Sequence, residues 1–315
     1  MDFMEFGQRL VASDDVDPLY PFLRHIYAKL SLTDEQRLWF TFLYVASYNI
    51  ASALWLFQRY PTVREVNRDV NGIPTGVERR GNRGRMMQGH INGFVRTIRT
   101  YGGIREWIEQ GWVNDEAFNF HGWTADSDGI RQNGLYANYE RFWVTSQTVN
   151  GNGRWATFKW AEILRKVHEM SLQAPDMRLK YSGKAEAKPA RCMNLFMMPT
   201  QSSVKALDRY GEILRETVAE RVGDKWDFDT LETILCNFHS MTQGHYYIGH
   251  DIDEMLHVIN VSDRLGATDK RFLFEARATV FKPDYLGEFR GWAETSKALK
   301  RQYQKTGVIG DRFPT

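Results

Sequence analysis

The sequence is poor in cysteine and lacks the common metal-binding and nucleotide-binding motifs. Its 315 residues include only Cys192 and Cys236, with no CxxC spacing. This excludes a zinc ribbon, a disulfide scaffold and a c-type haem. No GxxxxGK[ST] loop is present, which argues against ATP hydrolysis by a P-loop. The first ten residues, MDFMEFGQRL, carry acids where a secretory signal has basic residues, and no apolar segment follows, so we expect a cytoplasmic protein.

The sequence also lacks a convincing membrane span. Residues 38–58 contain no charge and are long enough on paper to cross a bilayer. Thr41, Ser47, Asn49 and Ser52 interrupt this run, however, and the mean hydropathy of the chain is −0.49. Helices that are apolar on all sides also occur in protein cores. We therefore expect a buried central helix and no membrane partner.

Strand signals are scarce and helical signals are frequent, so the sequence predicts a mainly α, multi-helix fold with at most a short β-hairpin around 142–149. Thr33 and Gln36 have capping-box spacing and Pro61 is a stop signal, which together predict one long helix over about 34–60. Apolar residues recurring at three and four positions predict the other helices, near 18–30, 154–171, 203–221, 229–241, 246–259 and 292–305.

Glycine and arginine are unevenly distributed along the chain, and this bears on domain organisation. Fourteen of the 25 glycines fall within 72–153, which indicates loops there and compact helical blocks on either side. We expect a single large, mostly helical unit or two lobes. The first lobe, about 1–150, would carry basic, glycine-rich loops, and the second, about 151–315, would be helical with a hairpin over 229–259.

A basic segment lies within an almost neutral protein. Residues 59–105 contain ten arginines, three acids and no lysine, whereas the whole chain has a net charge of +2. The densest part is ERRGNRGR at 78–85. Guanidinium groups bind phosphate oxygens in a bidentate way, and glycine lets the backbone come close. The pattern predicts a phosphate or DNA clamp formed by Arg79, Arg80, Arg83 and Arg85; the alternative is a solvated surface loop.

A second candidate anion site precedes a predicted helix. Gly151 and Gly153 lie just before it, and free backbone N–H groups at a helix N-terminus attract anions. Arg154 and Lys159 would add positive charge to this phosphate or DNA site. The alternative is that the Asn-Gly-Asn-Gly sequence is only the turn that closes a hairpin.

A third candidate site follows a helical hairpin. Asp229 and Glu232 have capping-box spacing, and a tight turn at Gly244 leads into the segment 246–257, which is rich in histidine and acids. One carboxylate or imidazole could act there as a general acid or base. The candidates for this role are His250, Asp251 and Asp253.

Two questions stay open at this third site. The sequence does not decide which of the two aspartates acts, and all of these residues could be ordinary capped and solvated helix residues. Glu254 and His257 form one Glu-x-x-His unit, but a di-iron site needs two such units and two further glutamates. We therefore expect no metal and no cofactor.

Three groups of residues together resemble a known family. They are Arg154-Trp155 followed by a helix containing Ala161-Glu162, the tyrosine-rich helix ending in Tyr60-Pro61-Thr62, and the Gly244-x-Tyr246 hairpin leading into an acidic helix. Over about 15–300 the chain resembles the bacteriophage amino acid:DNA transferases, also called α-glutamyl/putrescinyl thymine pyrophosphorylases. This family is related to the helix-hairpin-helix DNA glycosylases. The glycosylase hairpin has two glycines, whereas the hairpin here has one and no proline.

The resemblance implies a DNA hypermodification enzyme. After a kinase has phosphorylated 5-hydroxymethyluracil in phage DNA, the transferase replaces the phosphate or pyrophosphate with an amino acid or a polyamine such as putrescine. Its partners would be double-stranded DNA and the amine. A base in a duplex must be flipped out for such chemistry, and aromatic side chains can hold it by stacking. Trp155, Trp160 and Tyr246 are the candidates.

Other functions fit parts of the sequence. A helix-hairpin-helix glycosylase or lyase would release a base without using an amine. A non-catalytic DNA-binding accessory protein would use the basic segment alone, and its binding would depend steeply on salt. A helical partner domain that has lost the kinase of a split pathway is a third alternative.

Overall fold

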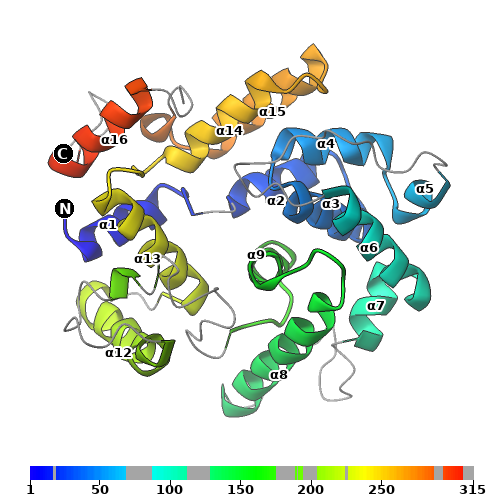
Figure 1. Cartoon of the computed structure of the whole chain (residues 1–315), viewed down its shortest axis with the longest axis horizontal. Coiled ribbons are helices and arrows are strands. Elements are labelled where there is room, and N and C mark those ends of the chain that lie inside the picture. The colour runs from blue at the N-terminus through cyan, green and yellow to red at the C-terminus, as the bar shows by residue number, and fades with distance from the viewer. Residues whose placement is uncertain are drawn as a thin grey trace. The chain divides into compact units, whose positions relative to one another are not determined.

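The computed structural model describes residues 1–16, 19–68, 87–111, 128–174, 189, 191–193, 204–223, 226–286 and 294–307 (Figure 1). Every long element in these ranges is a helix, and none of the described residues forms a strand, which confirms the mainly α prediction. The helices are α1 (Phe3–Ala12), α2 (Tyr20–Lys29), α3 (Asp34–Ser47), α4 (Ile50–Arg59), α5 (Val63–Arg68), α6 (Met87–Tyr101), α7 (Ile104–Gly111), α8 (Asp128–Gln147), α9 (Arg154–His168), α12 (Val204–Val222), α13 (Phe228–Thr242), α14 (His250–Val261), α15 (Ala267–Val280), the 3₁₀ helix η2 (Pro283–Tyr285) and α16 (Glu294–Thr306).

The chain divides into two compact units. The first unit comprises Met1–His25, Asp176–Val261 and Ala267–Thr315, and the second comprises Ile26–Pro175 and Ser262–Gly266. Helices α1 and α12–α16 therefore belong to the first unit, and α3–α9 belong to the second. These bounds differ from those of the two lobes expected from composition, because the N-terminal helix packs with the C-terminal part of the chain.

The core of the first unit joins the two ends of the sequence. Helix α1 packs on α13, and α13 packs on α16. The rings of Phe3 and Phe6 contact Phe238 edge-on at centroid distances of 5.4 and 5.5 Å. A Cβ atom on Gly7 would lie 2.3 Å from the Trp226 ring, so glycine allows α1 to approach this side chain closely. The apolar face of α1 thus fixes the segment that follows it.

The core of the second unit is a cluster of aromatic rings contributed by α3, α6, α7 and α9. Phe42 and Phe94 stack with ring centroids 3.7 Å apart, and Trp107 and Trp160 stack at 5.3 Å. These four side chains and Trp39 are fully buried or nearly so. Aromatic pairs of this kind stabilise a core beyond the area that they bury. Many aromatic side chains of the sequence therefore fill the core.

The long helix predicted over 34–60 is two helices. Its start is as predicted, because Thr33 and Gln36 form a reciprocal capping box. The prediction of one continuous helix is wrong because Tyr48 adopts a left-handed backbone conformation, with φ of 50°. The Asn49 side chain then accepts a hydrogen bond from the Ser52 N–H and caps α4. Asparagine and serine compete with helical hydrogen bonding in this way.

The short hairpin that the sequence allowed around 142–149 does not form, because α8 continues to Gln147. Tyr139, Phe142, Ser146 and Val149 are buried, and they recur with the period of a helix. Val144, between them, is 66% exposed. The local β-propensity of this segment is overridden because a helix buries one complete apolar face.

A chain of hydrogen bonds crosses the interior of the second unit. The Tyr27 hydroxyl and the Thr41 hydroxyl lie 2.7 Å apart, and the Thr41 hydroxyl lies 2.7 Å from Nε2 of His168. Burial, reinforced by the positive charge of Arg37, lowers the pKa of His168 to about 4. His168 is therefore neutral at physiological pH and links α3 to the end of α9.

This histidine makes stability sensitive to acid. In the unfolded chain His168 binds a proton below pH about 6.5, whereas in the folded chain it does so only near pH 4. The contribution of His168 to folding stability is therefore fully present above pH about 6.5 and is lost as the pH drops toward 4. Between pH 7.5 and 5.0 we expect a loss of about 2 kcal/mol from this group. Urea denaturation at both pH values measures it. His168→Gln cannot titrate, so its loss over the same interval should be smaller by that amount; equal losses in both proteins would contradict the assignment.

Among the described residues, no helix combines the length and the apolar character needed to cross a bilayer.

Candidate active site

The predicted helical hairpin is present in the first unit. Helix α13 begins after Asp227, whose side chain accepts a hydrogen bond from the Thr230 N–H at 2.8 Å, so Asp227 is the cap and the capping box predicted from Asp229 and Glu232 is wrong. A turn at Gly244 ends α13, with the His245 N–H donating to the Ser240 carbonyl. The second helix begins at His250, four residues later than the segment predicted from 246.

The residue before helix α14 is a glycine, which has no side chain to cap the helix. Gly249 has φ of +92°, a left-handed conformation that glycine adopts readily, and it has no side chain to accept hydrogen bonds from the first turn. Asp15 takes over this role from a distant part of the sequence. One carboxylate oxygen of Asp15 lies 2.7 Å from the Gly249 N–H, and the other lies 3.0 Å from the Ile252 N–H.

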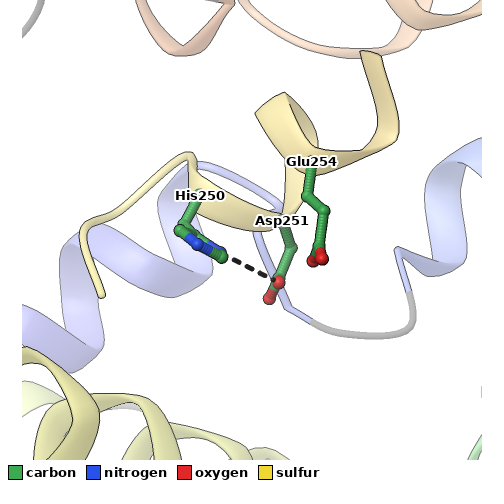
Figure 2. Close-up of side chains that lie close together, drawn as sticks. All are labelled: His250, Asp251 and Glu254. Atoms are coloured by element: carbon green, nitrogen blue, oxygen red, sulfur yellow. Dashed lines mark hydrogen bonds and ion pairs between the residues drawn. The ribbon is translucent and has the colours of Figure 1, made fainter. Parts of the chain in front are cut away.

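Three potential proton acceptors converge on the first two turns of α14. His250, Asp251 and Glu254 are all buried, and one side-chain oxygen or nitrogen from each lies within 4.8 Å of the other two (Figure 2). Nδ1 of His250 lies 3.4 Å from Oδ1 of Asp251. Figure 2 shows the Asp251 and Glu254 carboxylates on the same side of the helix. We call these three residues the α14 cluster.

The second aspartate candidate belongs to a different network. Asp253 is completely buried, and its Oδ1 lies 3.1 Å from Nη2 of Arg277 on α15. Its Oδ2 accepts a hydrogen bond of 2.7 Å from the Tyr247 hydroxyl. Nε of Arg277 also donates to the Ile252 carbonyl at 3.0 Å. These contacts join α14 to α15, and they favour a structural role for Asp253.

The structure also places the predicted stacking residues. Tyr246 is buried, and its hydroxyl donates to Asp15 at 2.6 Å. Trp160 is buried within the aromatic core of the second unit, where Trp107 stacks on it, so its burial argues against stacking on a base. Trp155 is half-buried with its ring 4.6 Å from that of Tyr48. Of the three predicted stacking residues, Trp155 is the most exposed to solvent.

The residues of the predicted anion site lie at and near the start of α9. Gly153 precedes the first turn and makes no side-chain cap, and Arg154 is exposed beside it. Gly151 lies close to His90 of α6, where a Cβ atom would be 3.0 Å from that side chain. Lys159, in contrast, is buried, and its Nζ lies 2.8 Å from a Glu162 carboxylate oxygen. The prediction that Lys159 binds phosphate is not supported, because this ion pair neutralises its charge.

The predicted clamp residues Arg79, Arg80, Arg83 and Arg85 lie outside the described residues.

Sequence reasoning missed two residues of the candidate site. Asp15 lies 231 positions before Tyr246, and Arg277 lies 24 positions after Asp253. Neither belongs to a motif. A possible signal for Asp15 was the lack of an N-cap side chain before His250, which requires a partner from elsewhere.

The α14 cluster has a ligand set that could hold a divalent cation, since it offers an imidazole and two carboxylates. The same set suits proton transfer, because carboxylates and imidazole are the usual general acids and bases. The single Glu-x-x-His unit in the sequence favours the second use.

Together these observations define a mainly helical protein in which an imidazole and two carboxyl groups lie buried together at the start of a helix. The family model for amino acid:DNA transferases matches residues 11–247, about three quarters of the chain, and the protein belongs to this family. The resemblance seen in the sequence is thereby confirmed, and with it the general activity, amino acid transfer onto DNA. The matched range includes Asp15 and Tyr246 and ends three residues before His250. No curated protein sequence matches the chain significantly.

Proposed function

We propose that this protein modifies phosphorylated 5-hydroxymethyluracil in double-stranded phage DNA, in the cytoplasm of the host cell, by replacing the phosphate or pyrophosphate with an amino acid or polyamine. The α14 cluster is the observation that carries the proposal. The family membership supports DNA and an amino acid as substrates.

The proposed reaction exchanges one bond for another at the methylene carbon of the base. The amine nitrogen forms a C–N bond, the C–O bond to the phosphate breaks, and the phosphate or pyrophosphate leaves with the electron pair. The amine must lose a proton to act as a nucleophile. We assign Asp251 as the acceptor of this proton, with His250 beside it at 3.4 Å.

The cluster has the electrostatic character that such a step requires. Two carboxyl groups that are both buried attract the positively charged form of an amine. A cationic substrate would also offset the cost of burying these carboxylates close together. Arginine side chains stabilise a departing phosphate in the transition state, and the sequence offers Arg154 and the four arginines at 79–85 as candidates for this role.

Mass spectrometry of nucleosides tests this proposal. DNA containing phosphorylated 5-hydroxymethyluracil is incubated with the protein and a pool of amino acids and polyamines, then digested. The expected product is a thymidine carrying the amine on its methyl carbon. Release of a free base without any amine would support a glycosylase or lyase instead. DNA binding with no change in nucleoside mass would support a non-catalytic accessory protein.

Chelation separates the two uses of the α14 cluster. If Asp251 acts as a general base without a metal, dialysis against EDTA should change the transfer rate by less than twofold. The rate is measured by the same nucleoside assay, with untreated protein as the control. Loss of activity that Mg²⁺, Mn²⁺ or Zn²⁺ restores would contradict the metal-free assignment.

A further inference from the structure

We propose that Asp15 is a positioning residue of this site: it holds the first turn of α14 and aims the Tyr246 hydroxyl, so that Asp251 faces the phenolic oxygen. The inference rests on the proposed function for its kinetic test. Asp15 does not act on substrate in this scheme. It acts through Tyr246 and Asp251.

Asp15 is itself held rigidly. It lies in the segment that joins α1 to α2, and it is completely buried. Its backbone N–H donates to the Ser13 hydroxyl at 3.2 Å. The Ser13 hydroxyl in turn donates to the Leu10 carbonyl at the end of α1. The position of the Asp15 carboxylate is therefore set by the end of α1, which packs on α13.

From this fixed point Asp15 replaces the missing cap of α14. Its carboxylate accepts from the Gly249 and Ile252 N–H groups, which lie on either side of His250 and Asp251 in the sequence. A carboxylate also interacts favourably with the positive end of the helix dipole. The two hydrogen bonds hold the backbone that carries the α14 cluster.

Tyr246 connects Asp15 to Asp251. Its hydroxyl lies 2.6 Å from Oδ2 of Asp15 and 3.4 Å from Oδ2 of Asp251. A phenol has one proton to donate, and the shorter contact, to Asp15, takes it. The phenolic oxygen then presents a lone pair toward Asp251. This arrangement stabilises the protonated form of Asp251, which is the form produced when Asp251 accepts a proton from the amine.

The burial and the charges around Asp15 also favour a proton on the Asp15–Asp251 pair. Burial, followed by the negative charge of Asp251, raises the pKa of Asp15 well above its ordinary value, while hydrogen bonds from Tyr246, Ile252 and Gly249 oppose this rise. Other titratable groups near the pair are Tyr246, which contacts both carboxyl groups, His250 and Glu254 of the α14 cluster beside Asp251, and Tyr303 on α16, which interacts with Asp15. Two buried carboxyl groups that repel each other favour a shared proton.

The test compares Asp15→Asn with Asp14→Asn. An asparagine at position 15 keeps the size of the side chain but removes its charge, and it offers one acceptor oxygen where the carboxylate offers two to the Gly249, Ile252 and Tyr246 donors. The hydrogen bond that holds the Tyr246 proton weakens, so Tyr246 can donate to Asp251, and the negative charge beside Asp251 is gone; both changes stabilise the Asp251 carboxylate. We expect the kcat for transfer to fall at least tenfold with KM for the amine little changed, and the acidic limb of the pH–rate profile to move to lower pH by about one unit. Asp14 is exposed, and its variant should match the wild type.

Tyr246→Phe provides a second variant in case Asp15→Asn does not fold. It should also lower kcat, and the double variant should lose little more than either single one, because both remove the same connection. If the losses of kcat in the two single variants add in the double variant and the pH profile is unchanged, the inference is wrong and Asp15 serves only as a structural cap of α14. If the wild type shows no transfer, the proposed function fails. NMR titration of the Asp251 carboxyl in wild type and Asp15→Asn would then decide the inference: a lower midpoint in the variant supports it and an equal midpoint overturns it.

Discussion

Replacing Asp251 with asparagine is expected to lower the rate of amine transfer by about 10²- to 10⁴-fold, the range typical for removal of a general base. The change keeps the size of the side chain and removes its ability to accept a proton. Stability should change little, because asparagine has nearly the same shape and the Asp251 contacts to His250 and Tyr246 are long, 3.4 Å each. The rate is measured by nucleoside mass spectrometry under single-turnover conditions.

The matched control is Asp284→Asn, at an exposed aspartate in η2 of the same unit. It should transfer at the wild-type rate. Glu254→Gln gives a further comparison, because Glu254 belongs to the α14 cluster but lies one turn beyond Asp251. An Asp251→Asn variant that keeps more than half of the wild-type rate would contradict its assignment as proton acceptor.

Replacing Arg277 with methionine is expected to destabilise the first unit by about 3–5 kcal/mol, because it leaves the Asp253 carboxylate buried without its cationic partner. The methionine retains much of the apolar stem. The hydrogen bond from Nε to the Ile252 carbonyl is also lost. Urea denaturation monitored by tryptophan fluorescence measures the change in the free energy of unfolding.

The double variant Arg277→Met/Asp253→Asn separates charge burial from packing. Without the carboxylate, no uncompensated charge remains, so the double variant should regain a large part of the lost stability. If it is as unstable as the single variant, packing or the Ile252 contact explains the loss. A single variant destabilised by less than about 1 kcal/mol would show that Asp253 does not depend on this ion pair.

The two predictions together address a choice that the sequence left open. Asp251 and Asp253 are two positions apart on one helix, so they point to different sides of it. Asp253 lies against Arg277 and Tyr247, whereas Asp251 lies with His250 and Glu254. We therefore expect Asp251→Asn to affect mainly the rate and Arg277→Met to affect mainly the stability.

Local signals predicted local structure well. The capping box at Thr33 and Gln36 and the turn at Gly244 occur as expected, because each depends on residues within a few positions of one another. The sequence allowed at most a short hairpin at 142–149, because its β-rich composition is a local signal, whereas the helix found there depends on the apolar partners that bury one face. The burial of Trp160 likewise depends on a distant residue, because its stacking partner Trp107 is 53 positions away.

The sequence by itself determined the helical class, the family and the segment that carries the α14 cluster, because periodicity and short motifs depend on neighbouring residues. Only the tertiary structure decided which aspartate lies with His250, and that Asp15 completes the site. These outcomes depend on which helices pack together: α1 brings Asp15 to the start of α14, and α15 brings Arg277 to Asp253. Burial makes these contacts necessary, because a charge removed from water needs a partner, which the chain here supplies from a distance.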